Sequence, residues 1–165
     1  MKSTFDNWYA EKMRANPEIS AETDRAQELL GEIETIAIVG ISRNRHKDSH
    51  FVGRYLKKVG YTIIPVNPAA DEILGEKAYP DLQSISGQID VVDIFLPPDI
   101  IPDAVDQALE VNPKAIWLQL GTGTHDELRD KVEGDGIRFF QKRCMKVDHQ
   151  FLIRPYHEEN KNTVS

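Results

Sequence analysis

The segment 35–66 constrains the fold of this chain more than any other. It opens with an apolar run at 36–39, in which β-branched residues dominate and which Gly40 ends; this is the pattern of a strand buried on both faces of a sheet. After a polar loop, apolar residues recur at helical spacing until Gly60, and a second apolar strand follows at 62–66. A strand, a helix and another strand form a βαβ unit, so we expect a parallel sheet.

The loop between the first predicted strand and the helix is cationic. It reads Ser42-Arg43-Asn44-Arg45-His46-Lys47 and carries three formal positive charges, in a chain whose formal net charge is -7. Free N–H groups and the helix dipole at a helix start both favour an anion, so this loop is suited to phosphate. A solvated basic loop is the alternative interpretation, because a glycine followed by a loop and a helix is a weak motif.

The rest of the chain continues the alternation. Further strands are predicted at 90–96, 115–120 and 137–141, and helices at 99–111 and 124–132. The segment at 73–82 is predicted to be a loop with a short strand at 77–79. Thr124 and Glu127 form a capping box for the last of these helices. Five or six strands alternating with helices predict one α/β domain at 35–157, with a doubly wound, Rossmann-like, mainly parallel sheet.

Residues 1–34 are predicted to be a helical extension of this domain. An amphipathic helix over 5–13 is interrupted at Asn16-Pro17, and Ser20 caps a second helix. These helices would cover the domain, or serve as the contact of a homodimer or a protein partner. The tail at 158–165 is polar and is expected to be flexible.

Composition narrows the classes of protein. With 165 residues and 40% apolar content, the chain is expected to form one ordinary soluble domain. A pI near 5.2 argues against general binding of nucleic acid or an anionic membrane, which needs a broad basic face. Cys144 is the only cysteine, so no intrachain disulfide can form and the expected location is the reducing cytoplasm. No apolar run approaches membrane length, and the N-terminus lacks the pattern of a signal peptide.

Ligands of a doubly wound sheet bind beyond the carboxyl ends of its strands. Those ends are predicted at 40–47, 67–68, 97–98, 119–121 and 143–145, and they should meet at one edge. A dinucleotide is the first ligand to consider, but only the first glycine of G-x-G-x-x-G is present. Asn67-Pro68 also stands where an Asp or Glu should hold a ribose, so an NAD(P)-binding oxidoreductase domain is the weaker interpretation.

Six pieces of the sequence match one known family in order and spacing: IAIVGIS at 36–42, GYTIIPVNP at 60–68, ILGEKAYPDL at 73–82, DVVDIFLPP at 90–98, AIWLQLG at 115–121 and RCMKVDH at 143–149. With these pieces the chain resembles the small CoA-binding proteins. That family is similar to the N-terminal nucleotide-binding domain of the succinyl-CoA synthetase α subunit.

The resemblance implies that the chain binds coenzyme A or an acyl-CoA. The implied contacts are Gly40, Ser42, Arg43, Asn44, Arg45 and Lys47 for the phosphates, Asn67 and Pro68 beside the nucleotide, Leu96 and Pro97 on the adenine or the start of the pantetheine arm, and Gln119, Leu120 and Gly121 on the floor. Arginine suits phosphate through its planar donor fork. The residue that reads the 3′-phosphate stays open among Arg43, Arg45 and Lys47.

The resemblance also implies that this domain alone lacks ligase activity, because the synthetase uses a histidine in a second α domain and a separate ATP-binding subunit. Binding without turnover is therefore the leading hypothesis. A competing hypothesis is redox chemistry, in which Cys144 forms a mixed disulfide with the CoA thiol; a buried structural cysteine is the alternative. A third hypothesis is a CoA-sensing subunit that docks a partner through residues 1–34. No metal site is expected, since the histidines lack metal-ligand spacing with Cys144.

Overall fold

The computed structural model describes residues 3–154. They form two compact units: residues 33–143, and residues 3–32 together with 144–154. The sequence predicts one domain over 35–157; in the structure, residues 144–154 group with the N-terminal helices. The predicted boundary at 157 and the predicted flexible tail at 158–165 lie outside the described residues.

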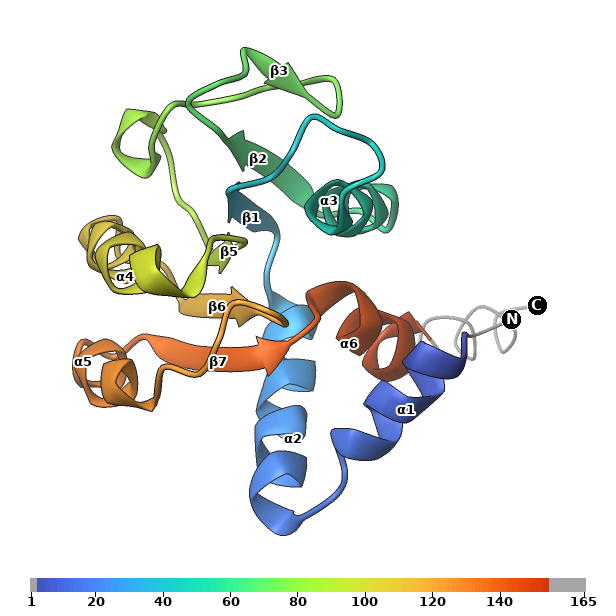
Figure 1. Ribbon diagram of the computed structural model, residues 1–165. Coiled ribbons are helices and arrows are strands. Elements are labelled where there is room, and N and C mark those ends of the chain that lie inside the picture. The colour runs from blue at the N-terminus through green and yellow to red at the C-terminus, as the bar shows by residue number, and fades with distance from the viewer. Residues whose placement is uncertain (1–2, 155–165) are drawn as a thin grey trace. The chain divides into compact units, whose positions relative to one another are not determined.

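A five-stranded parallel sheet forms the centre of the first unit (Figure 1). Its strands are β1 (Thr35–Val39), β2 (Thr62–Val66), β5 (Val91–Ile94), β6 (Ala115–Gln119) and β7 (Arg138–Arg143). Their order is β2-β1-β5-β6-β7, and every neighbouring pair is parallel. This confirms the predicted fold class. The chain leaves β1 for β2 on one side and later reaches β5 on the other, so the switch point of the sheet lies between β1 and β5.

Helices cover both faces of this sheet (Figure 1). On one face, α4 (Ile101–Glu110) and α5 (Arg129–Gly134) contribute to a core that includes Val92 and Ile94 of β5. On the other face lies α3 (Asp48–Lys58), whose Gly53 packs so closely that an added Cβ would stand 2.7 Å from Ile41 Cδ1. The absence of a side chain at Gly53 therefore lets α3 lie directly on the sheet.

The segment after β2 is a small hairpin rather than the predicted loop with a strand at 77–79. β3 (Glu72–Ile73) pairs antiparallel with β4 (Glu76–Lys77), and Tyr79 makes only an isolated bridge. Leu74 and Gly75 form the two-residue turn with φ of 59° and 74°. Such turns need positive φ at both positions, which leucine seldom adopts, so Leu74-Gly75 is not recognisable as a hairpin turn from its residue types.

The predicted capping box of Thr124 and Glu127 is wrong. His125, and not Thr124, is the N-cap residue here, and its backbone N–H donates to the side chain of Gln141 on β7, at 2.7 Å. A short 3₁₀ turn, η3 (Asp126–Leu128), then precedes α5, and the N-cap residue Leu128 makes no side-chain cap. The segment therefore begins as a 3₁₀ turn after His125 and not as an α-helix capped by Thr124.

The second unit contains three helices: α1 (Thr4–Lys12), α2 (Pro17–Glu32) and α6 (Met145–Leu152). The prediction that Ser20 caps α2 is wrong, because the helix already begins at Pro17, where Asn16 Oδ1 accepts the N–H of Ile19 at 2.9 Å. α6 was not predicted at all. In this unit, Gln27 Nε2 donates to the carbonyl of Leu152 at 2.9 Å and ties α2 to α6.

The carboxyl ends of β1 and β5 approach each other unusually closely. Gly40 follows β1 with φ +85°, and a Cβ at this position would lie 2.1 Å from the carbonyl oxygen of Phe95. The N–H of Phe95 in turn donates to Val39 O at 2.8 Å. Both the backbone conformation and the lack of space therefore require glycine.

Asp93 occupies the middle of β5, between Ile38 of β1 and Trp117 of β6. Its side chain is 0% exposed, and among the described residues neither carboxyl oxygen has a hydrogen-bond partner. Burial raises the pKa of Asp93 well above its ordinary value. Burial in the sheet therefore favours the neutral form of this carboxyl group, whose oxygens have no partner among the described residues.

We expect Gly40→Ala to lower the free energy of unfolding by about 3 kcal/mol, about 1 for the left-handed backbone and about 2 for displacing Phe95. Gly136→Ala is a matched control, because Gly136 has φ +77° but nothing within 4 Å of an added Cβ. It should cost only about 1 kcal/mol. Urea unfolding followed by circular dichroism measures both, and equal losses would contradict the close approach.

We expect Asp93→Val to stabilise the protein, by about 1–3 kcal/mol at pH 5. In the wild type, the folded state keeps a proton that the unfolded chain loses above about pH 4. Wild-type stability should therefore fall as the pH rises from about 4 through the raised pKa, by up to about 1.4 kcal/mol per pH unit.

The advantage of Asp93→Val should accordingly grow with pH. Asp93→Asn serves as its control: it removes the titration but keeps a buried polar group, so it should abolish the pH slope without relieving the burial. Urea titrations at pH 5, 6, 7 and 8 would measure both effects. If neither substitution changes the slope, Asp93 is not the buried neutral acid described above.

Candidate functional site

The carboxyl ends of the parallel strands lie at one edge of the sheet, as expected. Hydrogen bonds join the segments that follow β1 and β2. Gly40 N–H donates to Val66 O at 3.0 Å, and the side-chain amide of Asn67 donates to Ile41 O at 2.9 Å. At β5, Gly40 also borders Leu96, whose Cδ2 would lie 2.9 Å from an added Cβ. Predicted site residues from three strand ends are thus neighbours at the switch point.

The cationic loop is held by its own hydrogen bonds. Ser42 N–H donates to Ser49 Oγ at 2.9 Å, Asn44 N–H to Ser42 Oγ at 3.0 Å, and His46 N–H to Asn44 Oδ1 at 3.0 Å. His50 Nδ1 donates to Ser42 O at 2.9 Å from the first turn of α3. These bonds fix the path of the backbone without using any cationic side chain.

The charges of this loop point away from the core. Arg43, Arg45 and Lys47 are all exposed, and no pairing of their side chains with a carboxylate occurs among the described residues. Lys47 is the N-cap of α3 but makes no side-chain cap, which leaves N–H groups of the first turn without that partner. Exposed cations beside a helix start favour an anion.

Asn67 serves a structural purpose in addition to any contact with a ligand. Its Nδ2 bonds Ile41 O, and its Oδ1 accepts the N–H of Ala69 at 2.7 Å. The amide thereby locks the loop after β1 to the loop after β2. Pro68 is exposed beside it.

The segments after β5 and β6 also meet. Pro97 is exposed and precedes the 3₁₀ turn η2 (Pro98–Ile100). Pro98 packs on Gly123, where an added Cβ would stand 3.1 Å from Pro98 Cβ. Three residues at the end of β6 were predicted to form the floor of the site. Leu120 and Gly121 are exposed and face solvent, whereas Gln119 is buried, at 3% exposed.

Sequence reasoning missed a buried polar set that shapes the loop after β6. His125 is 6% exposed, and its Nε2 donates to Thr122 O at 2.8 Å. Gln141 accepts from His125 N–H and donates to Asp126 Oδ1 at 2.7 Å. Thr122 Oγ1 donates to Gln119 O at 2.7 Å. None of these residues stands in a recognisable local motif, so no sequence signal pointed to them.

Cys144, the candidate redox thiol, belongs to the other compact unit. It is 8% exposed and is the N-cap of α6. Its backbone N–H donates to the hydroxyl of Tyr9 at 2.6 Å. These features are typical of a buried structural cysteine.

Residues 3–154 contain no cluster of three or more His, Cys, Asp or Glu side chains suited to a metal ion. Within the same residues, no helix has the length and apolar character needed to cross a membrane.

Comparison with known proteins identifies relatives of several kinds. The chain is 35% identical over 123 residues to the uncharacterized protein YneT of Bacillus subtilis. This match covers 74% of this chain and 90% of YneT. It is 33% identical over 123 residues to the ADP-forming acetate–CoA ligase II of Archaeoglobus fulgidus, covering 73% of this chain but only 17% of the ligase.

A solved structure, that of a hypothetical protein from Pyrococcus horikoshii, superposes with a TM-score of 0.74 at 34% identity, over 79% of this chain and 92% of the other. Residues 34–150 match the family described as a CoA binding domain. The resemblance read from the six sequence pieces is thus confirmed, and the chain belongs to the CoA binding domain family.

Proposed function

We propose that this protein binds coenzyme A, or an acyl-CoA, at the carboxyl edge of its sheet, without ligase activity of its own. The observation that carries the proposal is the cationic loop 42–47, whose backbone is held by internal hydrogen bonds while its Arg and Lys side chains are exposed at the switch point. CoA carries a pyrophosphate and a 3′-phosphate, which need several cations. A preformed loop of this kind reduces the entropy cost of binding them.

The rest of the carboxyl edge of the sheet suits the other parts of the CoA molecule. Asn67 and Pro68 follow β2, the neighbour of β1, and would flank the nucleotide there. Leu96, Pro97 and Leu120 offer apolar surface on the β5 and β6 side, which suits the pantetheine arm. Gly40 leaves the backbone open to close approach by the ligand.

The proposal is limited to binding, because the relatives that carry a ligase name match this chain only over their CoA-binding part. The acetate–CoA ligases are named for the activity of whole proteins, and this chain spans 17% of each of two such ligases, from Archaeoglobus fulgidus and Methanocaldococcus jannaschii. The remainder of those ligases has no counterpart in the residues matched. Burial of the Cys144 thiol speaks against the redox alternative, since thiol exchange requires access.

The double variant Arg43→Ala/Arg45→Ala should weaken CoA at least about tenfold, because charge-assisted hydrogen bonds to phosphate are lost. If these arginines read the 3′-phosphate, dephospho-CoA should lose much less affinity than CoA. Isothermal titration with both ligands measures the difference. Arg54→Ala, an exposed arginine of α3 stacked on Phe51, is the matched control and should change neither affinity.

An equal loss for both ligands would instead assign the arginines to the pyrophosphate and direct attention to Lys47. Absence of CoA binding by the wild type would refute the proposed function itself. NAD and NADP, titrated in parallel, should give no saturable heat.

Cys144→Ser should leave CoA affinity unchanged, because the thiol is buried and its backbone, rather than its sulfur, makes the bond to Tyr9. Titrations of the two proteins with and without dithiothreitol test this. Mass spectrometry after incubation with CoA disulfide should find no mixed disulfide on the folded wild type. Detection of a stoichiometric adduct would revive the redox hypothesis.

A further inference from the structure

Two large aliphatic side chains are exposed on segments at the carboxyl edge of the sheet. Among the described residues, six large apolar side chains are exposed: Phe5, Trp8, Phe51, Val59, Ile100 and Leu120. Ile100, 41% exposed, ends the 3₁₀ turn that follows β5, and Leu120, 37% exposed, directly follows β6. β5 and β6 are neighbours in the sheet, so both side chains belong to the edge proposed to receive CoA.

The segments that carry these two side chains are linked to each other and to the cationic loop. Pro98, two residues before Ile100, packs on Gly123 of the loop after β6, at 3.1 Å from an added Cβ. Leu96 in turn borders Gly40, where the cationic loop begins. Apolar residues therefore follow the edge from the proposed phosphate site to the loop after β6.

Leu120 is fixed in place by backbone contacts that do not use its side chain. Its N–H donates to Arg143 O at 2.9 Å. Thr122 donates to Gln119 O from its N–H at 3.2 Å and from its hydroxyl at 2.7 Å. A Cβ added to the next residue, Gly121, would meet nothing within 4 Å, so the space beside this turn is open.

The other exposed apolar side chains lie elsewhere and have different neighbours. The rings of Phe5 and Trp8, both on α1, lie 5.8 Å apart between centroids. Phe51 lies beneath the guanidinium of Arg54, at 4.9 Å. Val59 is the C-cap of α3. None of these four follows a strand of the sheet.

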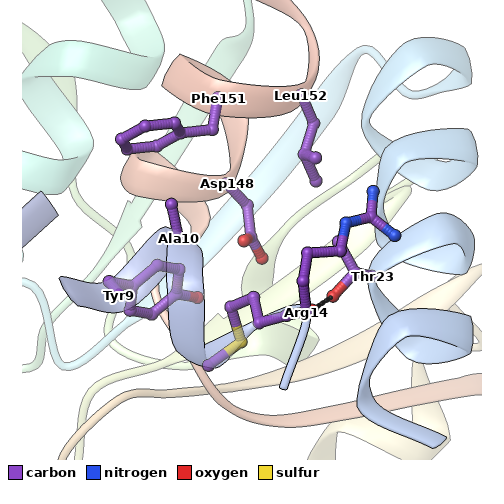
Figure 2. Close-up of a pocket in the computed structure, with 8 residues that line it drawn as sticks. Tyr9, Ala10, Arg14, Thr23, Asp148, Phe151 and Leu152 are labelled. Atoms are coloured by element: carbon purple, nitrogen blue, oxygen red, sulfur yellow. Dashed lines mark hydrogen bonds between the residues drawn. The ribbon is translucent and has the colours of Figure 1, made fainter. Parts of the chain in front are cut away.

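The cavity of the helical unit offers no comparable surface for a ligand. It has a volume of about 240 Å³ and lies among α1, α2 and α6 (Figure 2). Its polar lining residues already interact within the protein: Tyr9, Arg14, Thr23 and Asp148. No polar group of this lining therefore calls for a ligand.

CoA alone does not account for the aliphatic surface at Ile100 and Leu120. Its pantetheine arm contains two amide groups and ends in a thiol, and amides gain little from contact with aliphatic side chains. A hydrocarbon chain gains affinity with each methylene that it buries. A thioester on the CoA thiol attaches such a chain to the end of the arm.

We propose that the ligand is an acyl-CoA with an unbranched hydrocarbon acyl group of medium length, whose chain packs on Leu120 and Ile100. This inference rests on the proposed function and names its substrate class. Neighbouring strands lie about 4.8 Å apart, so a chain of about six carbons is long enough to reach both side chains, whereas an acetyl group is not.

Isothermal titration of the full chain with CoA, acetyl-CoA, hexanoyl-CoA and adipoyl-CoA tests the proposal. A methylene half-buried on this surface gives about a twofold gain, so hexanoyl-CoA should bind about tenfold more tightly than CoA, and acetyl-CoA within about twofold of CoA. Adipoyl-CoA has the same chain length but ends in a carboxylate. It should gain nothing over CoA, because burying a charge on apolar surface is unfavourable.

The variant Ile100→Ser/Leu120→Ser removes the aliphatic surface. Ile100 is the N-cap of α4, a position that serine suits. The ratio of hexanoyl-CoA to CoA affinity should fall from about tenfold to about twofold or less. Taking the ratio within one variant cancels any effect on CoA itself. Val59→Ser, which removes an equally exposed aliphatic side chain far from the strand ends in sequence, is the matched control and should keep the tenfold ratio.

Circular dichroism establishes whether each variant is folded, and the comparison of ligands on the wild type does not depend on any variant. Equal wild-type affinity for CoA and hexanoyl-CoA would overturn the inference, as would equal affinity for hexanoyl-CoA and adipoyl-CoA, or an unchanged ratio in the folded double variant. In each of these cases CoA still binds and the proposed function stands. If neither CoA nor any acyl-CoA binds the wild type, the proposed function itself fails.

Discussion

The carbonyl oxygen of Phe95 lies so close to Gly40 that no side chain fits between β1 and β5 at their carboxyl ends. This contact determines where the two central strands stop and how their loops diverge. Because β1 and β5 flank the switch point, the loop after β1 is free to turn toward β2 while the loop after β5 turns toward α4. A ligand of this architecture binds where the two loops diverge, and the close contact of the strand ends at this point requires glycine at position 40.

The cationic loop depends on that same turn for its conformation. Side-chain oxygens of Ser42, Asn44 and Ser49 accept backbone N–H groups in place of a helix or strand. The short polar residues therefore satisfy the backbone, and the long basic residues are left to face solvent. A loop in which these two tasks fall on different residue types can hold its shape without a ligand, even though like charges within it repel each other.

Much of this architecture is readable from local sequence. Buried parallel strands are continuous apolar runs, so β1, β2, β5 and β6 were predicted nearly to their ends. One error concerns a helix start: the segment after β6 begins as a 3₁₀ turn with His125 as its N-cap, and the bond from His125 N–H to Gln141 joins residues 16 apart in sequence, which no local pattern predicts. α6 has little local signal, since its buried residues include Asp148 and His149 and do not form an apolar stripe. The contact of Gly40 with Phe95 joins residues far apart in sequence, so the sequence predicted a turn there but not its tightness.

Two buried carboxyl groups, on β5 and just before it, illustrate why the direction of a pKa shift cannot be inferred from residue type. Burial alone would raise the pKa of Asp90, but hydrogen bonds from the N–H groups of Thr35 and Glu34, together with Lys114, outweigh it and lower that pKa. Asp93, three residues on, has no such donors and is kept neutral. The charged form of one residue therefore stabilises the sheet, while the other is a cost carried by its neighbours. Val91, Val92 and Ile94 are all 0% exposed, and each contributes about 1.5–3 kcal/mol on burial, enough together to offset one unsatisfied acid.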